Sequence, residues 1–126
     1  MTKNPPQILW LPQPEPHNYP AAYQFLCLIR TPTDAKRLSD NLRKIDTIRE
    51  FKAKDIFRAS GLSLLGISDD HVQKDIKKIE EGKPLSPLLL VRDCRMNTVI
   101  IADGYHRLCA IYRFDYDCVV KCKIVS

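Results

Sequence analysis

Residues 99–112 read VIIADGYHRLCAIY, and this stretch sets the order of secondary structure in the second half of the chain. The apolar or small residues 99–102 predict a strand, whereas YHRLCAIY spaces its apolar residues at three and four, as a helix with one buried face does. Asp103 and Gly104 lie between the two. We therefore predict a strand that ends at Ala102 and a helix that begins within two residues, with Asp103 as its N-cap.

The turn between this strand and this helix has the residues of an anion-binding site. The first amides of a helix lack internal acceptors and carry a partial positive charge, so a phosphate placed there satisfies them. Gly104 has no Cβ and lets a ligand approach the backbone, while His106 and Arg107 add side-chain donors beside the same amides. The alternative is that Asp103 only caps the helix and that His106 and Arg107 form surface or intrachain bonds. The string DGYHR alone leaves both interpretations open.

Composition indicates a single globular domain of 126 residues. The hydrophobic share of 44% and the charged share of 28% exclude a wholly disordered chain. No apolar run is long enough to span a membrane and the N-terminal residues lack a secretory signal, so we expect a cytoplasmic protein. The formal net charge of +5 favours anionic partners in general. The basic residues are mixed with acidic ones, so we do not expect nucleic acid as a partner.

The five cysteines indicate reduced thiols rather than a disulfide framework. Their number is odd and no Cys-x-x-Cys pair occurs. Cys118 and Cys122 would share one face of a strand, but no histidine lies at ligand spacing from them. We therefore predict ordinary packing for these two thiols and no metal site.

The first part of the chain predicts an extended arm and then helices. Prolines are concentrated at the start, and each one removes a backbone donor, so we predict a Pro-rich extended arm over 1–19. Its apolar residues around Trp10 should lie across the domain, a second subunit or another protein partner. A helical part follows over 20–47, in which Thr31 caps an amphipathic helix.

The rest of the chain, 48–126, predicts strands and helices around one core. A short strand over TIREFKA precedes a helix over KDIFRASG that Gly61 ends, and Ser68 caps a helix over SDDHVQKDIKKIEEG that Gly82 ends. The runs LSPLLLV and TVIIA predict a hairpin, followed by the helix YHRLCAIYRF and a last strand over CVVKCKIV. We therefore predict one α+β domain over 1–126.

The predicted helix over 69–81 has a cationic stripe beside its apolar one. At 100° per residue, its valine and isoleucines cluster on one side, while three basic residues share another. These basic residues are His71, Lys74 and Lys78. The stripe is either a solvated face or one wall of a binding site.

In the order helix, short Gly/Pro linker, strand, polar turn, strand, Gly-x-His-Arg, helix and strand, residues 68–126 resemble the ParB/sulfiredoxin superfamily. DGYHR is similar to the D-G-H-H-R signature of an archaeal-type free serine kinase and to the G-C-H-R signature of sulfiredoxins. Partition ParB proteins have G-E-R-R. The resemblance implies a ParB/sulfiredoxin-like fold, with a small mixed sheet flanked by helices. It also implies that the signature loop and the start of the next helix bind nucleotide phosphates.

The resemblance therefore implies ATP, or another nucleotide, with Mg²⁺ as the cofactors. Asp103 would be the catalytic residue, either as a metal ligand or as a base, and no second carboxylate for the other task is identifiable. Sulfiredoxins also hold the nucleotide with polar residues at x, x+3 and x+7 on the preceding helix, where this chain has the cationic stripe. The implied binding residues are Gly104, Tyr105, His106, Arg107, His71, Lys74 and Lys78.

Departures from the superfamily pattern narrow the expected function. Tyr105 stands where sulfiredoxins have their nucleophilic cysteine, and Cys109 would point elsewhere, so we do not expect reduction of a sulfinic acid. No helix-turn-helix domain follows the nucleotide fold, so we do not expect chromosome partition. We expect ATP-dependent phosphotransfer to a small molecule or, alternatively, a non-catalytic nucleotide-sensing or protein-interaction module. A ParB-like nuclease or DNA-binding protein is the third and least favoured alternative.

Overall fold

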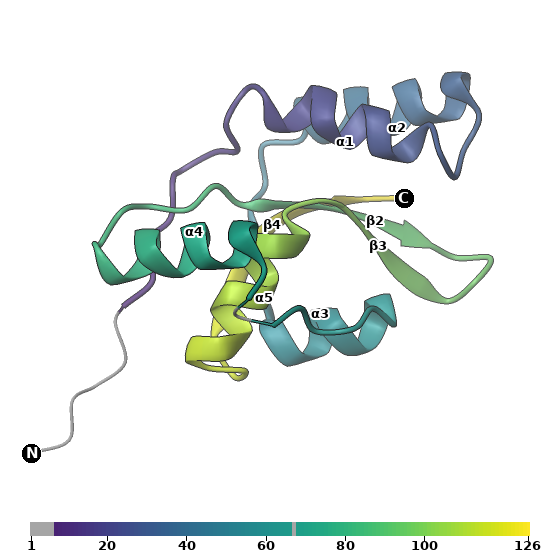
Figure 1. The fold of residues 1–126 in the computed structure, drawn as a ribbon. Coiled ribbons are helices and arrows are strands. Elements are labelled where there is room, and N and C mark those ends of the chain that lie inside the picture. The colour runs from purple at the N-terminus through teal and green to yellow at the C-terminus, as the bar shows by residue number, and fades with distance from the viewer. Residues whose placement is uncertain (1–6, 67) are drawn as a thin grey trace, which may run out of the picture.

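The computed structural model describes residues 7–66 and 68–126 (Figure 1). The helices of the described residues are α1 (Asn18–Leu26), α2 (Pro32–Lys44), α3 (Ala53–Ser60), α4 (Asp70–Glu80) and α5 (Tyr105–Phe114). The strands are β1 (Arg49–Lys52), β2 (Leu88–Asp93), β3 (Thr98–Asp103) and β4 (Val119–Val125). The order of elements agrees with the sequence-based prediction, and the α+β class is confirmed.

The four strands form one mixed sheet in the order β1-β4-β2-β3. β2 and β3 form the predicted antiparallel hairpin, and Asn97 in its turn has a positive φ of 54°. β4 lies between β2, to which it is parallel, and β1, to which it is antiparallel. The last strand in chain order is therefore an inner strand of the sheet.

Helices cover both faces of the sheet (Figure 1). α1 and α2 pack on one face, where their buried residues join Leu89 and Val91 of β2. α3, α4 and α5 lie on the other side, in a larger cluster that includes Leu88 and Leu90 of the same strand. Successive residues of β2 thus contribute to opposite layers, as the alternation of side chains along a strand requires.

The first layer also contains a buried lysine. Lys123 of β4 is only 2% exposed, and its Nζ donates a hydrogen bond of 2.9 Å to the hydroxyl of Tyr19 in α1. The ammonium also lies 5.3 Å from the centroid of the Tyr19 ring. This tyrosine therefore supplies the hydrogen-bond acceptor of the buried amine.

The proline-rich arm lies across its own domain. The amide of Leu11 donates to the carbonyl of Leu85, and the amide of Leu85 donates to the carbonyl of Leu9, both at 2.8 Å. These bonds attach the arm to the chain just before β2. Residues 1–6 of the predicted arm lie outside the described residues.

The arm ends before its predicted boundary of residue 19. α1 begins at Asn18, and Pro20 lies in its first turn. A proline is compatible with this position because the first amides of a helix have no intrahelical acceptor, so the missing N–H costs no hydrogen bond there. The predicted boundary at residue 19 therefore lies inside α1, because proline content does not distinguish an extended arm from the first turn of a helix.

Most predicted helix boundaries are confirmed. Thr31 caps α2 by accepting a hydrogen bond from the amide of Asp34, and Gly61 and Gly82 have the left-handed conformation of residues that follow helices. The prediction of Ser68 as the cap of α4 is wrong, because the N-cap is Asp69. Its carboxylate accepts the first amides of the helix, and these bonds lower its pKa. No helix in the described ranges has the length and apolar character needed to cross a membrane.

Candidate functional site

A cavity of about 260 Å³ lies where the N-terminal end of α5 meets α4. The two helices pack against each other on the same side of the sheet (Figure 1). The cavity is lined by His71, Lys74, Asp75 and Lys78 of α4 and by Asp103, Gly104, His106 and Arg107 of the β3–α5 turn. The structure thus brings together every predicted site residue except Tyr105, and it adds Asp75.

The turn into α5 differs from the prediction that Asp103 caps the helix. β3 continues to Asp103, and the N-cap is Gly104, with φ 105° and ψ 14°. No side chain caps the helix, because the carboxylate of Asp103 forms an ion pair with Arg107 at 2.9 Å instead. The first turn of α5 therefore presents its amides without a side-chain acceptor.

Gly104 is required by its neighbours as well as by its backbone conformation. A Cβ at this position would lie 2.7 Å from Cγ of Leu88 and 2.8 Å from Nη2 of Arg107. Both distances are below normal van der Waals contact, so no other residue fits without displacing one of these side chains. The turn is therefore packed tightly against β2 on one side and against the guanidinium on the other.

Arg107 is held in place on one side only. Its side chain is 15% exposed, and that of its partner Asp103 is 17% exposed. Nε of Arg107 is buried and has no hydrogen-bond partner among the described residues. One edge of the guanidinium is thus tied to the protein, while Nε is enclosed by the protein without an acceptor.

The α4 wall of the cavity combines exposed cations with a buried acid. Lys74, Lys78 and His71 are exposed at the rim, and no ion pair joins either lysine to the described residues. The ring of His71 lies 4.8 Å, centroid to centroid, from the ring of His106, so the two imidazoles are in contact with each other. The cationic stripe predicted from the sequence is therefore solvated and also faces the start of α5.

Asp75 is the site residue that sequence reasoning missed. It is 9% exposed, and burial raises its pKa, although the positive charges of Arg107 and Lys78 act in the opposite direction. On a helical wheel it falls between the cationic stripe and the apolar one, a position that the pattern left unassigned. It supplies the second carboxylate that the sequence did not identify.

Tyr105 is the predicted site residue whose side chain the structure places elsewhere. Its hydroxyl donates a hydrogen bond to the carbonyl of Ser63, on the segment after α3. Burial and a contact with Cys109 raise the pKa of this phenol. Only the backbone of Tyr105 belongs to the first turn of α5, and no cysteine lines the cavity.

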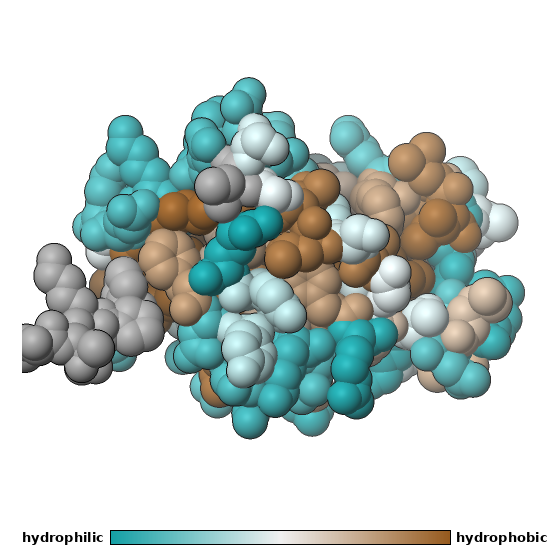
Figure 2. All heavy atoms as spheres, turned by 60° about the horizontal axis from the view of Figure 1, so that its bottom comes forward, coloured by the Kyte–Doolittle hydropathy of each residue, from teal (hydrophilic) through white to brown (hydrophobic). Residues whose placement is uncertain are grey.

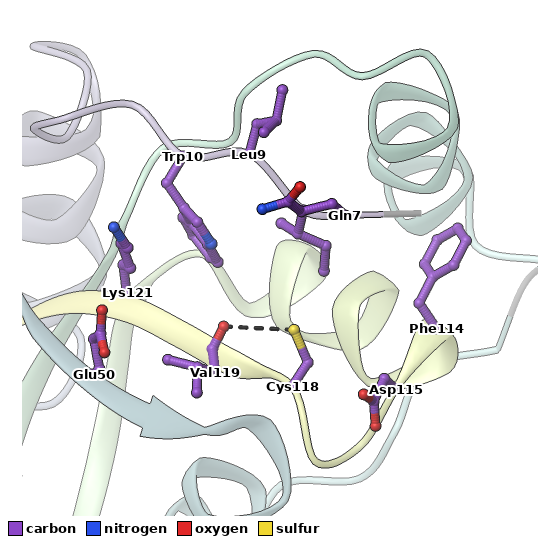
Figure 3. Close-up of a pocket in the computed structure, with 10 residues that line it drawn as sticks. Gln7, Leu9, Trp10, Glu50, Phe114, Asp115, Cys118, Val119 and Lys121 are labelled. Carbon is purple, nitrogen blue, oxygen red and sulfur yellow. Dashed lines mark hydrogen bonds between the residues drawn. The ribbon is translucent and has the colours of Figure 1, made fainter. Parts of the chain in front are cut away.

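A larger hollow of about 550 Å³ lies between the arm and the start of β4 (Figure 3). Trp10 points into it from the arm, and Lys121 and Glu50 approach it from neighbouring strands. It has both acidic and basic side chains and lacks a helix N-terminus, so its chemistry does not favour one class of ligand. The cavity between α4 and α5 has the more specific arrangement of groups.

A third cavity, of about 210 Å³, lies on the side of the molecule that carries α3. Figure 2 shows hydrophobic side chains gathered between hydrophilic ones on this side. The lining residues are Phe51, Asp55, Ile56, Ala59, Leu90, Arg92, Val99 and Ile124. Apart from one acid and one base, these side chains are apolar, and they form no polar binding site.

The cavity between α4 and α5 is thus a small polar site with five basic and two acidic side chains. Among the described residues, no group of three histidine, cysteine or acidic side chains is arranged to hold a metal ion. Comparison of the chain with protein-family models, with curated proteins and with solved structures found no match.

Proposed function

We propose that the protein binds a phosphate group, of a nucleotide or of another phosphate compound, in the cavity between α4 and α5. One observation carries this proposal: basic side chains from two separate elements converge on a helix N-terminus that no side chain caps. A phosphate placed there would accept hydrogen bonds from the first amides of α5. It would also accept from the side chains of His106 and Arg107, which line the same cavity.

The balance of charge in the cavity supports an anionic ligand. Asp103 neutralises Arg107 through their ion pair. Lys74 and Lys78 then remain against the single carboxylate of Asp75, so the cavity has an excess of positive charge before either histidine is protonated. Such a concave basic site attracts anions from solution.

ATP with Mg²⁺ is the proposed nucleotide, on the strength of the D-G-x-H-R resemblance. Carboxylate oxygens are ligands that Mg²⁺ accepts, and Asp103 would hold the ion, which neutralises charge on the transferred phosphate.

The five free cysteines favour a reducing compartment, which supports the cytoplasm as the location.

Phosphotransfer to a small molecule is the second step of this proposal. The observation that favours it is that two carboxylates, Asp75 and Asp103, line the same cavity. A phosphotransferase needs one group to hold the metal and another to accept the proton of the attacking hydroxyl.

If the protein is instead a sensing module, it will bind nucleotide without turnover, and Asp103→Ala will leave the affinity nearly unchanged.

Calorimetric titration tests the binding proposal. Phosphate, ATP, CTP and GTP are titrated with and without Mg²⁺ into the wild type and into His106→Ala and Lys78→Ala. We expect each variant to weaken binding by roughly 10- to 150-fold, which corresponds to about 1.5–3 kcal/mol for one hydrogen bond to a charged group. Lys77→Ala is the matched control, because Lys77 is exposed on the same helix outside the cavity. The absence of binding by every anion would refute the proposal.

The nucleic-acid alternative is tested with the same variants. A protein that neutralises DNA phosphates binds most tightly at low salt, because binding releases counterions. DNA affinity at low salt that falls in Lys78→Ala would favour a nuclease or DNA-binding protein. We expect no such affinity, since the basic residues outside the cavity are interspersed with acidic ones along the sequence.

A further inference from the structure

Asp75 is an acidic side chain in a cavity whose basic side chains attract anions. Its side chain lines the cavity and is nine-tenths buried, yet no hydrogen bond or ion pair joins it to the described residues. Positive charge surrounds it at longer range, from Arg107 and Lys78 and from His71 and His106 when they are protonated. The carboxylate oxygens are not among the fully enclosed atoms without a partner, so a ligand in the cavity that donates a hydrogen bond can reach them.

A carboxylate discriminates among oxyanions by their protons. It repels an oxyanion that carries no hydrogen, because two negatively charged acceptors then face each other with no proton between them. It binds an oxyanion that still carries a hydroxyl, because that hydroxyl donates a strong, charge-assisted hydrogen bond. Near neutral pH, phosphate retains a P–OH group, and a phosphomonoester retains one in part because its second pKa is about 6. Sulfate and phosphodiesters have no such proton.

We propose that Asp75 makes the cavity selective for a phosphate that carries a P–OH group, as inorganic phosphate or the end of a phosphomonoester does. In the complex, this hydroxyl donates to the Asp75 carboxylate, while the other phosphate oxygens accept from the α5 amides and the basic side chains. Sulfate and the diester phosphates of nucleic acid are then rejected, although their charge suits the cavity. This inference rests on the proposed phosphate binding and does not depend on phosphotransfer.

Anions of the same shape test the proposal without any mutation. Phosphate, arsenate and sulfate are titrated calorimetrically into the wild-type protein near neutral pH in EDTA, so that no metal bridges the carboxylate and the anion. All three are tetrahedral, but only phosphate and arsenate carry a hydroxyl. We expect phosphate and arsenate to bind similarly and sulfate to bind roughly 10- to 100-fold more weakly, as the loss of one charge-assisted hydrogen bond implies. Sulfate binding as tight as phosphate binding would overturn the proposal.

The variant Asp75→Asn assigns the selectivity to this residue. An amide can donate to a deprotonated oxygen, so we expect sulfate to bind more tightly and the phosphate-to-sulfate ratio to fall close to one. Asp70→Asn is the matched control, because it removes the same charge from an exposed position on the same helix and should keep the wild-type ratio. An Asp75→Asn variant that still discriminates by the wild-type factor would refute the assignment. If none of the three anions binds the wild type, the proposed phosphate binding fails as well, whereas phosphate and sulfate binding equally refutes the selectivity alone.

Discussion

Replacement of Gly104 by alanine tests the packing of the turn that begins α5. Two costs add at this position. An L-residue in a left-handed conformation costs about 1–2 kcal/mol, and the φ of Gly104 is 105°. The new Cβ would also lie 2.7 Å from Cγ of Leu88, and overpacking of this kind costs about 1–3 kcal/mol. We therefore expect Gly104→Ala to lower the free energy of unfolding by about 2–5 kcal/mol, a large part of the stability of a small domain.

Equilibrium unfolding in urea, followed by far-UV circular dichroism, measures this change. Gly82→Ala is the control, because Gly82 has a positive φ of 71° but no atom within 4 Å of the new Cβ. It isolates the conformational cost, about 1–2 kcal/mol. If both alanine variants lose the same stability, the close approach of Leu88 contributes nothing and the reasoning is refuted.

Three further predictions concern ionisable groups. Asp103→Ala should destabilise the fold by about 2 kcal/mol in urea unfolding, because Arg107 loses its partner in a mostly buried position, and added phosphate should restore part of the loss. Burial raises the pKa of Asp75, so native-state stability falls as pH rises through that pKa. Asp75→Asn should therefore melt at a higher temperature than the wild type at neutral pH, and the difference should vanish below the usual carboxyl value of 3.8. Burial raises the pKa of Cys122 to about 12, so iodoacetamide should label exposed Cys94 at pH 8 and reach Cys122 only after unfolding, as peptide mass spectrometry will show.

Local signals predicted the elements of the fold well. Thr31 before a proline, and Gly61 and Gly82 after amphipathic runs, mark helix boundaries by backbone chemistry that acts within a few residues. The two helix caps that were predicted wrongly, Ser68 and Asp103, involve competition between neighbouring polar groups. Ser68 and Asp69 can each cap α4, and the carboxylate is the cap in the structure because it accepts two amides of the positive helix end.

The candidate site was harder to predict where long-range contacts decide it. Asp103 has the chemistry of a helix cap, but the turn positions it against Arg107, an outcome that depends on the packing of Gly104 against Leu88. Burial of Asp75 depends on how α4 rotates on α5, which no periodicity within one helix specifies. Lys123 is likewise difficult to predict as a buried residue. Its ammonium donates a hydrogen bond to a tyrosine of α1, which is far from it in the sequence.

The inner position of β4 has a consequence for the order of events during protein synthesis. Among the described strands, β1 pairs with β4 alone, and β2 pairs with β3 and β4. Until residues 119–125 have left the ribosome, the β2–β3 hairpin is the part of this sheet that can form. During that time β1 has no strand to pair with. Both β1 and the hairpin then present free edges, which invite pairing with other chains. When β4 emerges, it pairs with β1 on one side and with β2 on the other. The four-stranded sheet on which both helical layers pack is therefore completed in a single step.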